Sequence, residues 1–119
     1  MKYTLSRFCD DQGNIPYTQW IKGLKDLKAV TKIDTRLDRA EEGNFGDHKY
    51  LREGIWAMRI DYGPGYRLYY AFEQKEMVIL LGGGDKKSQD DDINNAVSNW
   101  KIYQSREDDE KISKICVSR

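Results

Sequence analysis

The stretch from residue 55 to residue 73, IWAMRIDYGPGYRLYYAFE, decides the fold. Two alternating segments, residues 55–61 and 66–73, flank a Gly-Pro-Gly turn, and this arrangement predicts a β-hairpin. One set of alternate residues is apolar in both strands, which predicts a sheet with that face on a hydrophobic core. We interpret its aromatic rings as core residues rather than as a nucleobase platform. The apolar set comprises Trp56, Met58, Ile60, Tyr66, Leu68, Tyr70 and Phe72.

The other face of this hairpin carries two arginines. Both apolar faces meet one core only if the register is centred on Gly63, which places Arg59 across from or diagonal to Arg67, within roughly 8 Å. Like charges opposed on a sheet destabilise it, and planar guanidinium groups suit phosphate. The pair therefore indicates an anion-binding site. The alternative is a solvated face on which Asp61 and Glu73 neutralise the arginines.

The segment after the hairpin adds more cations. Residues 77–81, MVILL, do not alternate, which predicts a strand covered on both faces. The glycines at 82–84 do not form a nucleotide-binding loop, because no GxxxxGK[ST] pattern follows; we expect them to allow a bend or the close approach of a substrate. Lys86 and Lys87 come directly afterwards, so we expect them near the surface that carries the arginines.

The remaining segments predict a first strand and three helical stretches. Residues 2–8 alternate, and Pro16 opens a helix at its favoured first position. The apolar stripe is interrupted near residues 23–26 and continues to residue 40, which predicts two helices or one kinked helix that ends near Gly43. His48 then falls in a loop, where a solvated role is favoured over a catalytic one. A last helix starts after Ser88, which resembles a capping box with Asp91.

This order of elements, β-α-α-β-β-β-α, predicts an α+β fold in which helices pack against a small, mainly antiparallel, four-stranded sheet. With 119 residues of which 39% are hydrophobic, the chain builds one modest core. We therefore predict one domain, residues 1–106. We expect residues 107–119 to form a C-terminal extension whose charged start is typical of a frayed end. The alternative is that Ile112, Ile115 and Val117 dock on the sheet edge or on a second copy of the protein.

Composition excludes several classes of protein. Cys9 and Cys116 lie near opposite ends and form no Cys/His cluster, so we expect neither a metal nor another cofactor, and a reduced cytoplasmic setting. No apolar leader or membrane-length window is present, so we expect neither secretion nor membrane insertion. The 20 basic and 20 acidic residues cancel, which weakens broad electrostatic binding of RNA but allows a local cationic patch.

Two runs resemble a known family: WAMRIDYGPGYRLY at residues 56–69 and LLGGGDKKSQ at residues 80–89. They are similar to the HigB-like addiction-module killer proteins of the RelE/ParE superfamily of type II toxins. The resemblance covers about residues 3 to 106. It extends upstream through Pro16, Trp20, Leu24 and the segment around Arg36, Arg39 and Gly43, and downstream to Trp100.

The resemblance implies a metal-free mRNA endoribonuclease, acting free or on the ribosome, that arrests translation. In the RelE branch the 2′-hydroxyl attacks the adjacent phosphate, and Arg67 would be the main phosphate clamp, assisted by Arg59. Lys86 or Lys87 would protonate the leaving oxygen or hold its charge. Tyr69, on the predicted polar face, would stack a base. The resemblance also implies a cognate antitoxin, generally of the helix-turn-helix, HigA-like kind.

The chain departs from that pattern at one catalytic position. RelE-type enzymes carry a tyrosine after the basic position, whereas this sequence has residues 90–93, DDDI. The role is vacant, or Tyr62 or Tyr66 in the turn fills it. Two alternatives to a nuclease therefore stay open: a ParE-like inhibitor of DNA gyrase that cleaves nothing, and a degenerate module that only binds its antitoxin.

Overall fold

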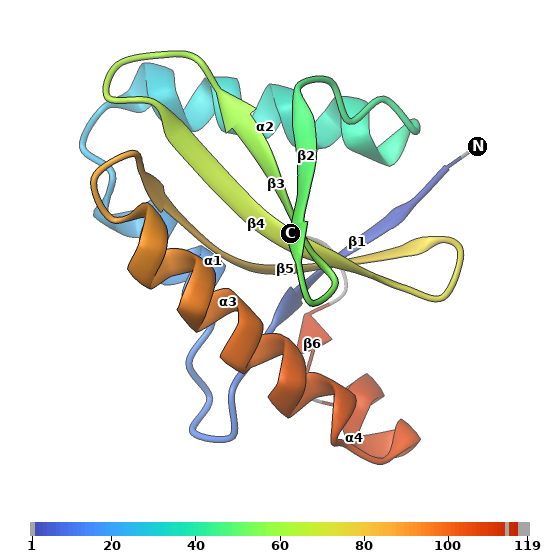
Figure 1. The fold of residues 1–119 in the computed structure, drawn as a ribbon. Helices are drawn as coiled ribbons and strands as arrows, with labels where there is room; N and C mark the ends of the chain where they lie inside the picture. Colours follow the sequence, from blue (N-terminus) through green and yellow to red (C-terminus); the bar gives the residue numbers. More distant parts are fainter. Residues whose placement is uncertain (1, 114, 117–119) are drawn as a thin grey trace.

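The computed structural model describes residues 2–113 and 115–116. Strands and helices follow one another in the order that the hairpin and the helical apolar stripes of the sequence predict (Figure 1). The structure has one further strand before the hairpin, and a short helix and strand at the end. The strands are β1 (Thr4–Phe8), β2 (His48–Arg52), β3 (Ile55–Ile60), β4 (Tyr66–Glu73), β5 (Met77–Asp85) and β6 (Ile115–Cys116). The helices are α1 (Pro16–Gly23), α2 (Leu27–Glu41), α3 (Gln89–Gln104) and α4 (Asp108–Ser113).

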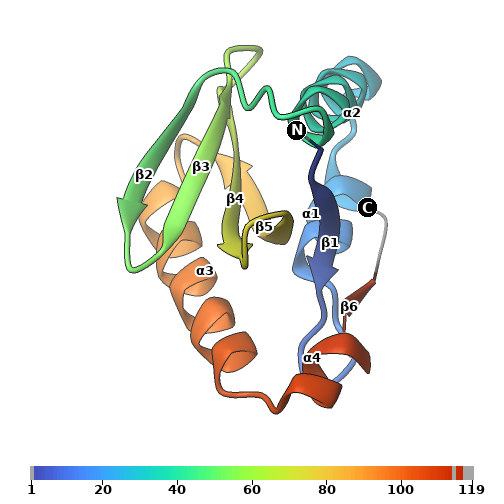
Figure 2. The ribbon, with the colours of Figure 1, turned by 90° about the vertical axis from the view of Figure 1, so that its right-hand side faces the viewer.

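The strands form one sheet in the order β2-β3-β4-β5-β1-β6, which Figure 2 shows side by side. The sheet is antiparallel from β2 to β5, and β1 then joins β5 in parallel. The α+β class is confirmed, but the count of four strands is wrong. Strand β2 replaces the expected loop around His48; its sequence, HKYLR, is mostly polar, as edge strands often are, and so gives no strand pattern. Strand β6 is only a two-residue pairing of Ile115 and Cys116 with the end of β1.

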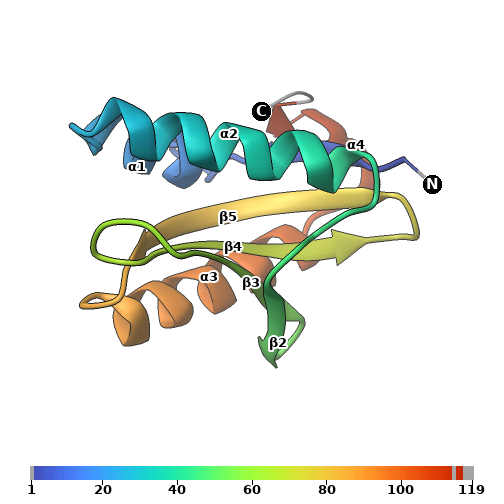
Figure 3. The same cartoon turned by 90° about the horizontal axis from the view of Figure 1, so that it is seen from above.

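Helices cover both faces of this sheet (Figure 3). Helices α1 and α2 pack on one face, over a core that includes Ile33, Leu37, Met58, Leu68 and Tyr70. Helix α3 packs on the other face, over a second core that includes Ala57, Tyr69, Ala71, Ile79 and Trp100. The second face of the hairpin was expected to be polar, and this expectation is wrong. Charged residues of this face lie only near its ends: Arg59 and Arg67 near the turn, and Glu73 at the far end of β4.

The hairpin register is the one that the turn predicts. Trp56 pairs with Tyr70, and Arg59 pairs with Arg67, so the pairing is centred on Gly63. Strand β5 lies between β4 and β1, with Leu80 in one core and Ile79 in the other, which confirms a strand covered on both faces.

The expected helices are present, with one difference in capping. Pro16 is the first residue of α1. The apolar stripe of residues 17–40 divides into two helices because Asp26 caps α2, by accepting hydrogen bonds from the backbone N–H groups of Lys28 and Ala29. The capping box expected from Ser88 and Asp91 is wrong. The backbone N–H of Ser88 donates instead to Asp85 Oδ1, at 3.2 Å. Among the helices of the described residues, none has the length and apolar character needed to cross a bilayer.

Arg106 joins the end of the last long helix to the first strand. Its side chain is only 3% exposed, and Nη2 donates to the Cys9 carbonyl at 2.8 Å and to Asp11 Oδ1 at 3.2 Å. The guanidinium also lies over the Phe8 ring, 5.0 Å from its centroid. Helix α4 follows. The side chains of the expected docking residues Ile112 and Ile115, and all of Val117, lie outside what the structure describes.

Candidate functional site

The two arginines of the hairpin are direct neighbours on adjacent strands, as the register requires. Arg59 is exposed and forms an ion pair with Asp47, whose Oδ1 lies 2.9 Å from Nη2. The anion that neutralises Arg59 is therefore Asp47, from the loop before β2, and not Asp61 as the alternative proposed. Of the two arginine charges, that of Arg59 is therefore neutralised within the protein.

Arg67 is compensated much less. Its side chain is partly buried, and its Nε has no hydrogen-bond partner within the described part of the chain. None of the ion pairs between described residues includes Arg67. An unpaired buried donor costs about 1–3 kcal/mol, and more for a charged group, so a site of this kind has capacity for an anionic ligand.

The two lysines lie in the loop from β5 to α3, beside the hairpin turn (Figure 1, left). A β-carbon built on Gly65 would lie 4.0 Å from that of Lys86, so this loop contacts the turn. Asp85 shapes the loop by accepting a hydrogen bond from the backbone N–H of Lys87 at 2.9 Å. Both lysine side chains are exposed. The structure thus brings all four predicted cations to one end of the sheet.

Carboxylates share this end with the cations. Burial raises the pKa of the Asp92 carboxyl, and the charges of Asp85 and Asp91 raise it further. The pKa of the nearby Tyr69 hydroxyl rises to about 12, first through burial and then through Asp92. Among the described residues, no group of three or more His, Cys, Asp or Glu side chains is arranged to hold a metal ion.

The structure places the three predicted substrate-binding tyrosines in different surroundings. Tyr69 is 0% exposed under α3, so its ring is not free to stack a base as predicted. The Tyr62 hydroxyl donates to Asp26 Oδ2 at 3.0 Å, which raises the pKa of Tyr62. Tyr66 belongs to the core on the opposite face of the sheet from Arg67, where it packs near Trp20 with ring centroids 6.4 Å apart.

His48 is not the solvated loop residue that the sequence suggested. It begins β2 and is partly buried, with its ring stacked between Phe45 and Trp56 at centroid distances of 5.4 and 5.0 Å. Its Nδ1 lies 2.7 Å from the Tyr70 hydroxyl. These ring contacts give His48 a role in packing.

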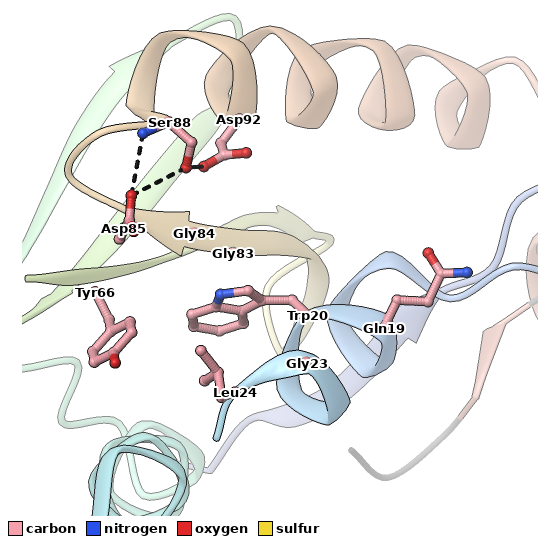
Figure 4. Close-up of a pocket in the computed structure, with 10 residues that line it drawn as sticks. All are labelled: Gln19, Trp20, Gly23, Leu24, Tyr66, Gly83, Gly84, Asp85, Ser88 and Asp92. Atoms are coloured by element: carbon pink, nitrogen blue, oxygen red, sulfur yellow. Dashed lines mark hydrogen bonds between the residues drawn. The ribbon is translucent and has the colours of Figure 1, made fainter. Parts of the chain in front are cut away.

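A cleft of about 400 Å³ opens beside the end of β5 (Figure 4). Its floor is the backbone of Gly83 and Gly84. Side chains of α1, of the residue after it and of β4 form an apolar wall, and side chains from the end of β5 and the start of α3 form a polar wall. The apolar wall consists of Trp20, Leu24 and Tyr66, and the polar wall of Asp85, Ser88 and Asp92.

The glycine run was the available signal for this cleft. A β-carbon at Gly83 would lie 2.3 Å from the Trp20 ring, and one at Gly84 would lie 1.8 Å from Asp92 Oδ2. Glycine is therefore required because an indole and a carboxylate lie against opposite faces of the strand. The close approach expected at this run involves side chains of the protein itself. The sequence did not indicate that Trp20, Ser88 and Asp92 line one cleft.

Helix α2 adds a second charged surface. Lys28, Lys32 and Arg39 lie on one exposed flank, which we call the basic flank, and Asp34 and Asp38 lie on the other. Their spacings of four and seven residues align each set along the helix.

Arg36, on the same side of α2 as the basic flank, has a structural task. It donates hydrogen bonds to the carbonyls of Phe45 and Asp47, at 2.9 and 3.1 Å, and to that of Arg59. Burial lowers the pKa of its guanidinium. The contacts tie α2 to the loop and strand that carry the Asp47–Arg59 ion pair.

These features define a small α+β protein with cations gathered at one end of its sheet. The chain belongs to the family described as "Phage derived protein Gp49-like (DUF891)", whose model matches residues 19–102. It is a toxin-like family of the type II toxin–antitoxin kind, related to RelE and HigB, in which a toxin is expected to have a cognate antitoxin.

A curated relative is an uncharacterized protein of Haemophilus influenzae, 46% identical over 65 residues. The match covers 55% of this chain and 66% of that protein. The chain thus spans just under two thirds of the length of the relative that it matches.

Proposed function

We propose that this protein is the toxin of a type II toxin–antitoxin pair and that it cleaves mRNA without a metal ion. The observation that carries the proposal is Arg67, a partly buried guanidinium without an ion pair among the described residues, beside Arg59 and the lysine loop. A phosphodiester supplies the negative charge and the acceptor oxygens that this guanidinium lacks.

In the proposed reaction, the ribose 2′-hydroxyl gives its proton to solvent water and its oxygen attacks the adjacent phosphorus. The bond from phosphorus to the 5′-oxygen breaks, and this oxygen takes up a proton. The products are a 2′,3′-cyclic phosphate and a 5′-hydroxyl. Arg67 stabilises the charge of the phosphorane, and Lys86 or Lys87 serves the leaving oxygen.

The basic flank of α2 supports a polyanionic target in a chain with no net charge. Lys28, Lys32 and Arg39 are exposed, and they lie on the helix that Arg36 ties to the hairpin. We propose that this surface holds RNA, free or within the ribosome, by contacts with phosphates.

The test is a comparison of inducible expression of the wild type and of Arg67→Ala. We expect the wild type to stop incorporation of amino acids before incorporation of DNA precursors, and to leave cleaved mRNA with 5′-hydroxyl ends in the presence of a chelator. Expression of Arg67→Ala is expected to leave growth and the incorporation of amino acids unchanged. Arg52→Ala is the matched control, because Arg52 lies on the edge strand β2 and contacts Glu53 and Asn94. Full toxicity of folded Arg67→Ala would refute the site.

A ParE-like inhibitor of DNA gyrase is the second candidate. The observation that favours it is the acidic end of α3, where Asp90, Asp91 and Asp92 occupy the stretch in which a RelE-type nuclease carries its tyrosine. Carboxylates close to Arg67 oppose the approach of a phosphate. For this candidate, replication stops first and mRNA stays intact.

The proposal also requires an antitoxin. Co-expression with the reading frame beside the gene is expected to restore growth, and the two proteins are expected to co-purify. Failure of both would count against a toxin–antitoxin pair, whichever target the toxin has.

A further inference from the structure

The cleft beside β5 combines features that the proposed cleavage reaction does not use. Its apolar wall offers the uncovered part of the Trp20 ring, because Trp20 is partly exposed, next to Tyr66. Its floor is the backbone of Gly83 and Gly84, against whose opposite faces Trp20 and Asp92 lie. A volume of about 400 Å³ is at the small end of the range of roughly 300–1,000 Å³ typical of small-molecule sites. A flat aromatic ligand of modest size suits these walls.

The polar wall of the cleft presents hydrogen-bond acceptors. Asp92 Oδ2 lies 2.5 Å from the Ser88 hydroxyl, and no cation pairs with Asp92 among the residues that the structure describes. A carboxylate has about four acceptor positions, so most of the capacity of Asp92 is unused. Asp85 is different, because its Oδ1 already accepts from the backbone N–H groups of Lys87 and Ser88. The ligand must therefore bring donors to Asp92.

Guanine is the nucleobase that meets this requirement. Its Watson–Crick edge places the N1–H and N2–H₂ donors side by side, which matches a carboxylate. Adenine and cytosine offer one amino group next to a ring nitrogen that accepts, and uracil offers one N–H between two carbonyls. A carboxylate repels those neighbouring acceptors.

The cleft also adjoins the proposed phosphate site. Gly84 on the floor pairs with Arg67 on the neighbouring strand, and Lys86 follows Asp85 of the polar wall directly. A base in the cleft would therefore carry its sugar and phosphate toward the cations.

We propose that this cleft binds a guanine base of single-stranded RNA, with Trp20 as the aromatic wall and Asp92 as the acceptor for N1–H and N2–H₂. The inference rests on the proposed function and adds to it a preference for cleavage next to guanine. Asp92 is a binding residue in this assignment. Cleavage itself stays with Arg67 and the lysine loop.

The test uses nucleosides, which carry no phosphate and so report on the cleft alone. Guanosine, adenosine, cytidine and uridine are titrated into the isotopically labelled full chain, and the NMR signals of the Trp20 indole N–H and the Gly83 and Gly84 amides are followed. We expect guanosine to shift these signals with an affinity at least about tenfold higher than the other three nucleosides, as a matched pair of hydrogen bonds provides.

Two carboxylates one residue apart provide the matched control. Asp92→Asn keeps the size of the side chain but replaces one acceptor by a donor, and we expect the preference for guanosine to fall below about threefold. Asp91→Asn removes the same charge from an exposed position outside the cleft and should keep the preference. Spectra of both variants establish that each is folded.

Three results would overturn the inference: no shift of these signals at millimolar guanosine, equal shifts with all four nucleosides, or equal effects of the two substitutions. The proposed function fails separately. Guanosine binding without any cleavage of RNA would refute the proposed nuclease activity and support the cleft as a nucleoside site. Cleavage of RNA without guanosine binding would support the nuclease activity and refute the guanine site.

Discussion

The indole ring of Trp20 lies against Gly83 so closely that a β-carbon on this glycine would be 2.3 Å from the ring. Gly83→Ala must therefore displace Trp20 or bend β5, and we expect it to lower the free energy of unfolding by about 1–3 kcal/mol. Chemical denaturation measures the change. Gly23→Ala is the matched control, since its β-carbon would have no heavy atom within 4 Å, and Gly23 ends α1. It should be neutral or slightly stabilising. Equal losses in the two variants would contradict this account of the contact.

Removal of Arg67 is expected to affect activity far more than stability. Its Nε makes no hydrogen bond to any described residue, and Arg59 lies directly opposite, so Arg67→Ala removes repulsion together with some packing. We expect the free energy of unfolding to change by less than about 1 kcal/mol. Thermal denaturation of the purified variant checks this, and a larger loss would indicate that Arg67 serves the fold.

Buried tyrosines should make the fold sensitive to alkali. The pKa of Tyr69 is about 12 in the folded protein and about 10 in an unfolded chain, and burial also raises the pKa of Tyr70. Between these values the unfolded chain releases protons that the folded protein retains. The stability that Tyr69 contributes is thus fully present below pH 10 and falls by about 1.4 kcal/mol per pH unit above it.

Urea denaturation from pH 9 to pH 11.5 measures this slope. Tyr69→Phe keeps the ring and removes the ionising hydroxyl, so its stability should fall less steeply above pH 10 than that of the wild type. Identical slopes would show that Tyr69 ionises as easily in the folded protein as in the unfolded chain.

Arg106 provides a test of how the last long helix is held. Arg106→Ala removes the hydrogen bond to the Cys9 carbonyl and the contact with the Phe8 ring, and we expect a loss of about 2–4 kcal/mol. Asp11→Asn weakens only the ion pair, whose carboxylate is 65% exposed, and should cost less than about 1 kcal/mol. Similar losses in both variants would place the stabilisation in the ion pair instead.

The sequence predicted the hairpin well because strict alternation and a glycine turn leave one register that gives both apolar faces the same core. It failed for the second face, where Ala57, Tyr69 and Ala71 share one face with charged residues such as Arg59 and Arg67. Small side chains and a tyrosine do not reveal whether a distant helix covers them. Only the packing of α3 shows that they form a core.

The candidate site likewise has contacts that the sequence predicts and contacts that it does not. Arg59 and Arg67 come together through local pairing, which a pattern can predict. The pairing of Arg59 with Asp47 and the contacts of Trp20 and Asp92 with the glycines depend on how a loop and two helices pack on the sheet. Such contacts leave no periodic signal.

The two flanks of α2 separate charge along one helix of a chain whose formal net charge is zero. Lys28, Lys32 and Arg39 lie on one side of the helix, and Asp34 and Asp38 on the other, so a nearby polyanion exerts a torque even though it exerts little net pull. If RNA is the target, as proposed, the protein is expected to approach it with the basic flank foremost. Screening shortens the reach of this alignment to about 8 Å at physiological salt. Added salt should slow productive encounters by randomising orientation rather than by weakening overall attraction.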